Sequence, residues 1–196
     1  MFTGIIAAVG TVREVRPAAG GVRIAIDTAM LDLAGVSPGD SIAVDGVCLT
    51  AVELQSSGFE ADVSQETLHC TSGFTAGARV NLEKSLRLAD PLGGHLVSGH
   101  VDGVGIVTRF EASGENRLLA IAAPRELAKY IARKGSVAVN GVSLTVNAVD
   151  GSVFEINLIP HTLQATNLNR LTLGSRVNLE VDLLARYAER LTGASK

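Results

Sequence analysis

Cysteine, aromatic residues and charge are all scarce in this chain of 196 residues. It has two cysteines, no tryptophan, 4% aromatic residues and 19% charged residues. The two cysteines, Cys48 and Cys70, are too few for a disulfide framework, which favours a reduced, cytoplasmic setting. Low charge beside 46% hydrophobic residues argues against a disordered chain.

Long runs of one kind of residue are also missing from the sequence. No cluster of lysine and arginine occurs and the formal net charge is −3, so we expect no nucleic-acid partner. No apolar run reaches the roughly 18 residues that a membrane span requires. Residues 1–12 have no basic lead-in and no signal-like cleavage pattern. We therefore expect no membrane partner.

The sequence does contain one long internal repeat. Residues 41–50 (SIAVDGVCLT) and 136–145 (SVAVNGVSLT) are identical at seven of ten positions, at an offset of 95. Residues 77–83 (GARVNLE) and 174–180 (GSRVNLE) match at an offset of 97, which indicates a two-residue insertion. A repeat this long is a whole small domain. We expect domains at 1–95 and 96–182, followed by a terminal segment at 183–196.

Most of each repeat has the pattern of short strands separated by Gly-rich turns. The pairs Asp45-Gly46 and Asn140-Gly141 predict tight hairpins with positive φ. Closely spaced short strands of this kind are typical of a small antiparallel barrel. In the first repeat, the alternating and β-branched segments predict strands at Val22–Asp27, Ser41–Val44, Leu49–Leu54, Phe59–Val63 and Val80–Glu83.

Few helices are expected. Pro124–Gly135 has proline at its start and glycine at its end, and Ala29–Ala34 is its shorter counterpart. The segment Leu183–Leu191 places leucine, tyrosine and alanine on one helical face, which must be buried against either a partner subunit or its own barrel. Pro91, Gly93 and Gly94 identify Lys84–Ser98 as a linker.

Several motifs together resemble the riboflavin synthase alpha-chain family. They are MFTGII at residues 1–6, GVCLT at 46–50, GGHLVSGHVDG at 93–103 and GVSLTV at 141–146. The resemblance extends over essentially the entire chain and includes both lumazine-binding repeats. It implies an all-β fold, namely two tandem homologous six-stranded Greek-key barrels with short helices and a C-terminal α-helix.

The resemblance also implies a reaction. Two molecules of 6,7-dimethyl-8-ribityllumazine exchange a four-carbon unit and give riboflavin and 5-amino-6-ribitylaminopyrimidinedione, with no cofactor or metal. The family is homotrimeric, with its site between the N-terminal barrel of one subunit and the C-terminal barrel of another. Holding two substrates face to face makes their encounter intramolecular, which is worth up to about 7–11 kcal/mol.

One substrate molecule donates carbon and the other accepts it, so the two repeats should differ. In the alignment Cys48 faces Ser143, Ile5 faces His100, Asp62 faces Asn157 and Glu66 faces His161. These differences lie within matching motifs and are a reason to expect chemistry. Which repeat binds the donor is left open.

The family pattern assigns substrate-binding residues to each repeat, where backbone amides at strand ends would bind the pteridine edge. Ser41 and Asp62 are candidates for the ribityl hydroxyls. The first site is expected to contain Gly4, Ile5, Ile6, Ser41, Cys48, Leu49, Thr50, Asp62, Val63, Ser64, Gln65, Glu66 and Thr67. The second is expected to contain Gly99, His100, Val101, Lys134, Ser143, Leu144, Thr145, Asn157, Leu158, Ile159, Pro160, His161 and Thr162.

Five residues are candidates for catalysis, namely Cys48, His100, Ser143, Phe2 and Asp182. Cys48 is either a nucleophile or polar contact, or a small buried apolar residue. His100 is either a proton-transfer group or a histidine with a structural hydrogen bond. Phe2 could cover the pteridine face, and Asp182 could orient a hydroxyl or base unless it is a surface carboxylate.

Three other features are weaker. His95 and His100 are separated by five positions without a nearby cysteine, so a metal site is not expected. The role of His161 is uncertain because some relatives have glutamate there, and we interpret Cys70 as structural. Gly103-Val104-Gly105 is followed by no expected helix, which excludes a dinucleotide fingerprint.

Two other classes of protein compete with an enzyme. A non-catalytic lumazine- or flavin-binding antenna protein has the same two barrels and often has a degraded second site. A purely structural barrel leaves the paired motifs unexplained. Both repeats here retain their glycine and threonine positions, and Cys48, His100 and Ser143 occur together, which favours the enzyme.

Overall fold

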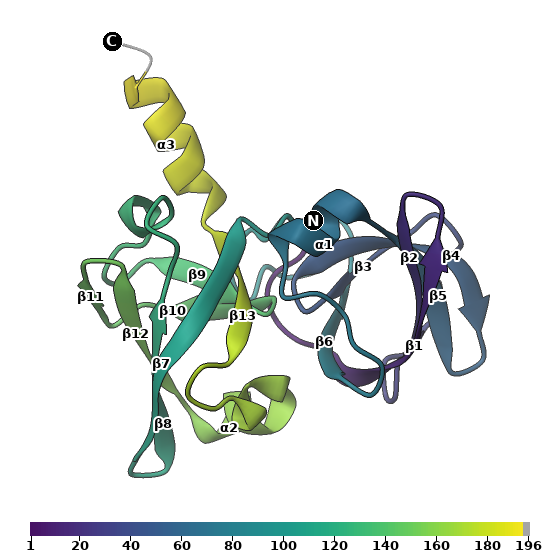
Figure 1. Ribbon diagram of the computed structural model, residues 1–196, viewed down its shortest axis with the longest axis horizontal. Coiled ribbons are helices and arrows are strands. Elements are labelled where there is room, and N and C mark those ends of the chain that lie inside the picture. Colours follow the sequence, from purple (N-terminus) through teal and green to yellow (C-terminus); the bar gives the residue numbers. More distant parts are fainter. Residues whose placement is uncertain (194–196) are drawn as a thin grey trace.

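The computed structural model describes residues 1–193 of the chain as two β-sheet bodies side by side, with one helix projecting from the second (Figure 1). The first body is a closed antiparallel barrel with strand order β1-β2-β5-β4-β3-β6, a Greek-key arrangement. Its strands are β1 (Ala8–Ala18), β2 (Gly21–Asp27), β3 (Ser41–Val44), β4 (Val47–Gln55), β5 (Gly58–Ser64) and β6 (Arg79–Lys84).

The second body repeats the first at the offsets found in the sequence. Its strands start 95 residues after their counterparts, and the last one starts 97 residues after. They are β7 (Gly103–Ser113), β8 (Asn116–Ala122), β9 (Ser136–Val139), β10 (Val142–Thr145), β11 (Ala148–Asp150), β12 (Val153–Leu158) and β13 (Arg176–Val181). The predicted mostly-β fold with two tandem barrel-like repeats is confirmed.

The second sheet differs from the expected six strands in one place. It has seven strands in the order β10-β9-β13-β7-β8-β12-β11, so its two end strands are consecutive in sequence. In the first barrel, β4 shifts register between Ala51 and Glu53, which is a β-bulge. At the equivalent point of the second repeat, Val146 and Asn147 leave the ladder altogether. One strand is thereby divided into two and the curled sheet stays open.

Both predicted tight hairpins have the expected backbone. Asp45 and Asn140 adopt φ of 48° and 46°, and the glycines after them both adopt 77°. Two successive positive φ values are the geometry of a type I′ turn. Gly46 and Gly141 also face each other across the junction of the barrels, where a Cβ on either would lie 2.7 Å from the other's backbone nitrogen.

An asparagine-rich polar cluster joins the two barrels beside these hairpins. The side-chain amide of Asn81 donates to the carbonyl of Asn140 at 2.9 Å, and that of Asn178 donates to the carbonyl of Asp45 at 2.9 Å. The Asp45 carboxylate accepts from the Asn81 backbone and the Asn167 side chain. Each barrel therefore satisfies buried polar groups of the other.

Apolar residues fill the interior of each sheet separately. Val12, Ile24 and Phe59 belong to the first core, and Leu119, Ile121 and Phe154 to the second. The alternation of buried and exposed residues along β4 leaves Cys48 and Thr50 on its outer face. A site built on these strands must therefore lie outside the barrels.

The helices are few and short, as expected. They are α1 (Gln65–Cys70), α2 (Pro160–Ala165), the 3₁₀ turns η1 (Ala128–Tyr130) and η2 (Asn167–Arg170), and α3 (Leu183–Gly193). The predicted helix at Leu183–Leu191 lies within α3, whereas residues 194–196 lie outside the described part. No helix in residues 1–193 is long and apolar enough to cross a bilayer.

The helix predicted at Pro124–Gly135 is wrong, as is its counterpart at Ala29–Ala34. The former contains only η1, and the N–H groups of Leu127, Tyr130 and Ile131 bond three residues back along the chain. Leu127 and Ile131 are buried against the second core. Tertiary packing fixes this connection as a series of tight turns. The proline and the glycine mark its two ends, but no α-helix lies between them.

Candidate functional site

The segments that precede the first strand of each repeat are built alike. We call Thr3–Ala7 and Ser98–Asp102 the leader segments. Glu83 in β6 accepts hydrogen bonds from the backbone and hydroxyl of Thr3 and from the Gly4 N–H, at 2.6–3.0 Å. Glu180 in β13 accepts the equivalent three from Ser98 and Gly99, at 2.6–2.9 Å. Burial raises the pKa of both carboxyls, while these donors act in the opposite direction.

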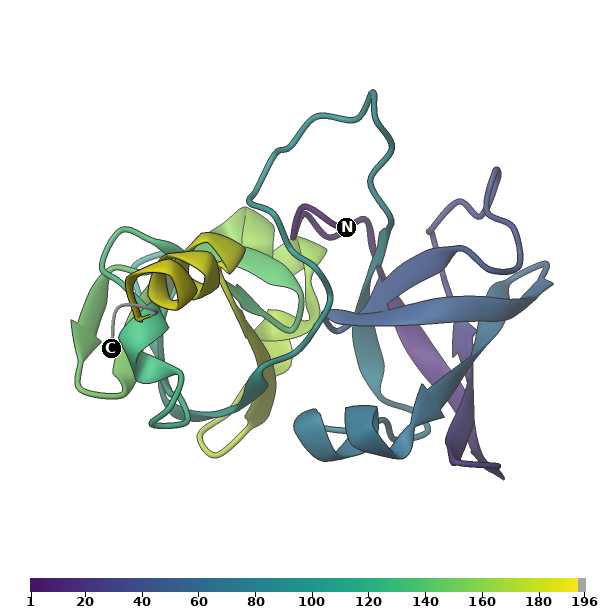
Figure 2. The ribbon, with the colours of Figure 1, turned by 90° about the horizontal axis from the view of Figure 1, so that it is seen from above.

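Each leader segment contacts the barrel of the other repeat. The Gly99 carbonyl accepts from the Cys48 N–H at 2.8 Å, and the Gly4 carbonyl accepts from the Ser143 N–H at 2.8 Å. Val101 packs on the first core and Ile6 packs on the second. Figure 2 shows the amino-terminal segment and the inter-repeat connection between the two sheets. Each leader segment therefore joins the two barrels: it bonds to a glutamate of its own repeat and to a backbone N–H of the other, an exchange of contacts between the repeats.

This exchange follows an approximate two-fold axis between the barrels. Phe2 and Val97, which are 95 positions apart, pair with each other through two backbone hydrogen bonds of 2.7 and 3.1 Å. Their side chains form one buried cluster with Ala43 and Ala138, another pair at this offset. Cys48 packs against the same cluster.

The first half-site is a cavity of about 200 Å³ on the outer face of the first barrel. It brings together Cys48 from β4, Glu66 and Cys70 from α1, and His100 from the leader segment of the second repeat. Thr67 and Gly99 also line it. The Cys70 thiol donates to Glu66 at 3.4 Å, which raises the pKa of Cys70. Two thiols, a carboxyl and an imidazole thus share one opening.

The predicted grouping of the leader residues is reversed by these contacts. Gly99, His100 and Val101 were expected with the second repeat but line the cavity of the first. Gly4 and Ile6 were expected with the first repeat but contact the second. The alignment identifies equivalent residues correctly. Backbone hydrogen bonds across the approximate two-fold axis determine which barrel each leader residue contacts.

The second half-site contains a histidine that sequence reasoning did not assign. His95 is 9% exposed, and its Nδ1 lies 2.7 Å from the Ser143 hydroxyl. Its Nε2 has no hydrogen-bond partner among the described residues. Burial lowers the pKa of His95, and the nearby Asp182 carboxylate opposes this. The sequence signal that could have identified His95 is the GGH of the junction motif. Gly94, which precedes His95, has no side chain and therefore allows the chain to approach Ser143 closely.

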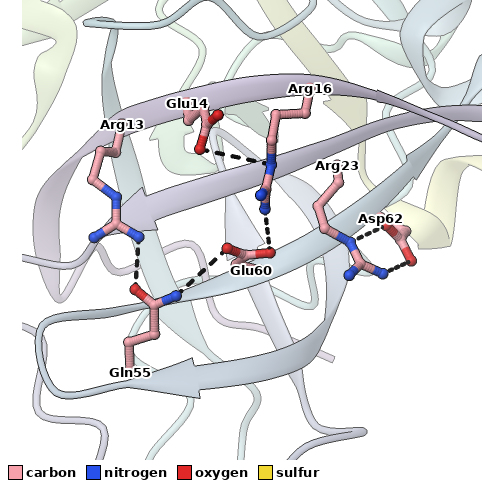
Figure 3. Close-up of polar contacts among 7 residues, drawn as sticks. All are labelled: Arg13, Glu14, Arg16, Arg23, Gln55, Glu60 and Asp62. Carbon is pink, nitrogen blue, oxygen red and sulfur yellow. Dashed lines mark hydrogen bonds and ion pairs between the residues drawn. The ribbon is translucent and has the colours of Figure 1, made fainter.

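Asp62 lies on the outer surface of the first barrel and is paired with arginine. Its two carboxylate oxygens accept from Arg23 at 2.7 and 2.8 Å, which lowers its pKa (Figure 3). Arg16 and Glu60 form a second pair in the same row. Asp62 must leave Arg23, or act together with it, to bind a ribityl hydroxyl.

The remaining predicted residues lie at different places on the two barrels. Ser41 pairs with Thr50 across β3 and β4, near the outward side of Cys48. Lys134 has a positive φ of 70°, and Asp182 accepts from the Leu184 N–H at the start of α3. Leu49, Val63, Leu144 and Leu158 are buried, whereas Ile5, Thr145, Asn157, Ile159 and His161 are exposed. Ser64, Gln65, Pro160 and Thr162 lie at or within the starts of α1 and α2.

Phe2, a candidate for covering the pteridine face, lies in the interior of the protein. Its side chain is 0% exposed and is enclosed by the cluster on the two-fold axis. Cys48 packs against the cluster that contains Phe2.

Within residues 1–193, no three histidine, cysteine or acidic side chains are arranged to hold a metal ion. The thiol, carboxyl and imidazole groups of the first half-site can contact an organic ring and transfer protons.

Sequence comparison identifies the family of these two half-sites. A model described as the lumazine binding domain matches residues 3–85 and again residues 98–182. The chain belongs to the riboflavin synthase family. Riboflavin synthase from Brucella abortus is 45% identical over the full length of both chains. The enzymes from Photobacterium leiognathi and Bacillus subtilis are 45% and 39% identical, over 97% of this chain and 88% and 89% of theirs.

Solved structures agree with the riboflavin synthase assignment at the level of the fold. LumP complexed with riboflavin has a TM-score of 0.83 and 26% identity, over 92% of this chain and 99% of LumP. LumP complexed with 6,7-dimethyl-8-ribityllumazine has a TM-score of 0.81 and 24% identity. Identity to the riboflavin synthases is much higher than to LumP, and the predicted family, fold and enzyme class are confirmed.

Proposed function

We propose that this chain converts two molecules of 6,7-dimethyl-8-ribityllumazine into riboflavin and 5-amino-6-ribitylaminopyrimidinedione. The observation that carries this proposal is the pair of half-sites with matching backbones and different side chains. Cys48 and His100 lie in one. Ser143 and His95 lie in the other. Two half-sites with equivalent backbones can bind two copies of one molecule. Their different side chains can make one copy the donor and the other the acceptor of the four-carbon unit.

The reactive positions belong to the lumazine, so the protein mainly positions the rings and moves protons. We assign proton transfer or ring contact to Cys48 and His100 in the first half-site and to Ser143 in the second. Asp182 acts on the second half-site through the charge it exerts on His95. We assign the ribityl hydroxyls to Ser41 and Asp62.

Replacement of Cys48 with serine is expected to slow turnover by about 100-fold, the low end of what a positioned proton-transfer group contributes. Serine keeps the packing against Phe2 and retains a hydrogen-bonding group, so lumazine binding should be largely unchanged. Steady-state rates and fluorescence titration on the same preparation separate the two effects. Wild-type turnover in Cys48→Ser would remove Cys48 from the mechanism.

The complete site requires a second subunit in this proposal. The first half-site offers about 200 Å³, which is below the roughly 300–1,000 Å³ typical of small-molecule sites. The exposed apolar stripe of α3 provides a surface for association. Leu184, Tyr187 and Leu191 are 71%, 64% and 76% exposed, so packing of this face on its own barrel is excluded as an explanation. We propose a homotrimer in which α3 makes this contact.

Deletion of residues 183–196 is expected to dissociate the trimer at micromolar protein concentration, because it removes the exposed apolar side chains Leu184, Tyr187 and Leu191. Sedimentation velocity measures the outcome. Leu184→Asp should weaken association in the same direction without truncation. A truncated chain that sediments as the full-length oligomer would refute this role for α3.

The division into 1–95, 96–182 and 183–196 and the cytoplasmic location also remain proposals. The location rests on the two free cysteines. LumP was crystallised with riboflavin and with flavin mononucleotide, so an antenna-like binding protein is the second candidate function.

The deciding experiment incubates purified protein with 6,7-dimethyl-8-ribityllumazine alone and follows riboflavin absorbance. Formation of riboflavin without added cofactor or metal supports the enzyme. Tight binding without riboflavin would assign the chain to the antenna-like class. Neither binding nor turnover would refute both candidates.

A further inference from the structure

The two leader segments differ in one connection. In both, a backbone N–H donates to the last sheet strand, from Ala7 to Leu82 at 2.9 Å and from Asp102 to Leu179 at 2.8 Å. Ala7 and Asp102 are equivalent at the offset of 95, but only Asp102 has a carboxylate. That carboxylate accepts from the Val181 N–H at 2.7 Å and pairs with Arg186 of α3. Only the leader segment that lines the first half-site is thus joined to the C-terminal helix.

The ion pair is buried on its Asp102 side. The Asp102 side chain is 8% exposed, and that of Arg186 is 41% exposed. A second cavity, of about 310 Å³, separates the leader segment from α3 and is lined by both residues and by His100. His100 therefore lies between the first half-site and the helix. Its backbone N–H donates to the Ser98 hydroxyl at 3.2 Å.

The position of α3 is fixed from its other side as well. Glu189 pairs with Lys129 and accepts from the Tyr130 hydroxyl, both in η1 of the second barrel. The Arg186 guanidinium lies 5.7 Å from the Tyr130 ring centroid, within range of a cation–π contact. The polar face of α3 thus docks on its own chain while the apolar stripe stays exposed.

We propose that Arg186 is a positioning residue that holds His100 in the first half-site through Asp102, a role that rests on the function proposed above. The ion pair connects the helix that carries the association surface to the segment that carries His100. Ligand affinity of the first half-site therefore depends on the Asp102–Arg186 pair, whereas the leader segment of the second half-site has Ala7 at this position and lacks the connection.

The test uses the full-length chain with Arg186→Gln, which removes the charge and leaves a shorter, polar side chain. Titration with riboflavin should resolve two classes of site per chain. One class is expected to weaken about 5-fold or more, the usual lower range of coupling between sites, and the other to stay unchanged. Asp102→Asn should have the same effect, and the double variant should be no worse than either single variant.

Arg190→Gln is the matched control, because Arg190 is exposed on the same helix and forms no ion pair within residues 1–193. Equal weakening of both classes, additive effects in the double variant, or weakening that only follows dissociation in sedimentation would overturn the proposal. Riboflavin binding is measured without turnover, so these outcomes are distinct from the absence of riboflavin formation in the wild type.

Discussion

Replacement of Phe2 with alanine is expected to lower the free energy of unfolding by about 3–5 kcal/mol. The ring is fully buried and shares its cluster with Val97, Ala43 and Ala138 on the two-fold axis. One of its ring carbons also approaches Gly99, where an added Cβ would lie 2.9 Å away. Truncation therefore leaves a cavity beneath Cys48 and removes the support of the segment that carries His100.

The Phe2→Ala protein should also turn over more slowly under conditions where it is still folded. The reason is that both sides of the first half-site, Cys48 and Gly99, lose a packing partner. Urea denaturation and steady-state kinetics below the unfolding transition measure the two quantities. Val97→Ala is the matched comparison, since Val97 occupies the equivalent position and loses fewer buried atoms, with an expected cost of about 1–3 kcal/mol. A Phe2→Ala protein within about 1 kcal/mol of the wild type would contradict the burial argument.

Replacement of Asp45 with asparagine is expected to stabilise the protein above neutral pH. Burial raises the pKa of Asp45 to about 7, although its carboxylate accepts hydrogen bonds from Asn81 and Asn167. The equivalent residue in the second repeat is Asn140, whose side-chain oxygen accepts from the Asn178 N–H in the same way. An asparagine at position 45 can keep both acceptor contacts without a buried charge.

The sign of the pH dependence follows from the raised pKa. The unfolded chain releases the Asp45 proton near its ordinary pKa of about 4, whereas the folded chain holds the proton until about pH 7. The contribution of Asp45 to stability is therefore complete below about pH 4, declines as the pH rises to 7, and is lost above that pH. The total loss is about 2–4 kcal/mol.

Thermal unfolding at several pH values tests this expectation. Asp45→Asn should melt about 5–10 °C above the wild type at pH 8 and close to it at pH 4. Asn140→Asp should change stability in the opposite direction at pH 8, because it adds a carboxylate at the equivalent position. If the difference in melting temperature between Asp45→Asn and the wild type did not vary with pH, the buried carboxyl would not be the cause.

The repeat made much of the strand pattern predictable from sequence. The predicted strands at Val22–Asp27 and Ser41–Val44 lie within β2 and β3, and the glycine pairs gave both hairpins. These features depend on local geometry, namely alternation along a strand and positive φ in a turn. The division of one strand into β10 and β11 was not predictable, because a bulge and a break have similar local sequences.

Non-local features of the site could not be read from the sequence. The offset of 95 relates Gly4 to Gly99 but does not reveal that each bonds to the other repeat's barrel. The contact of His95 with Ser143 depends on that exchange, and so does the burial of Phe2. The Pro124–Gly135 segment was misjudged for a related reason, since the core contacts of Leu127 and Ile131 override its helix signals.

Exchange of the leader segments has a consequence for the ancestry of the chain. A single repeat could not complete a half-site of this kind. The leader segment that contacts the Cys48 strand belongs to the other repeat. Two identical copies could form both half-sites as a dimer, in which the leader segment of each copy contacts the barrel of the other. Gene duplication followed by fusion through residues 85–97 would preserve that dimer within one polypeptide. In a fused chain the two half-sites can change independently, which allows a thiol at Cys48 in one and a hydroxyl at Ser143 in the other.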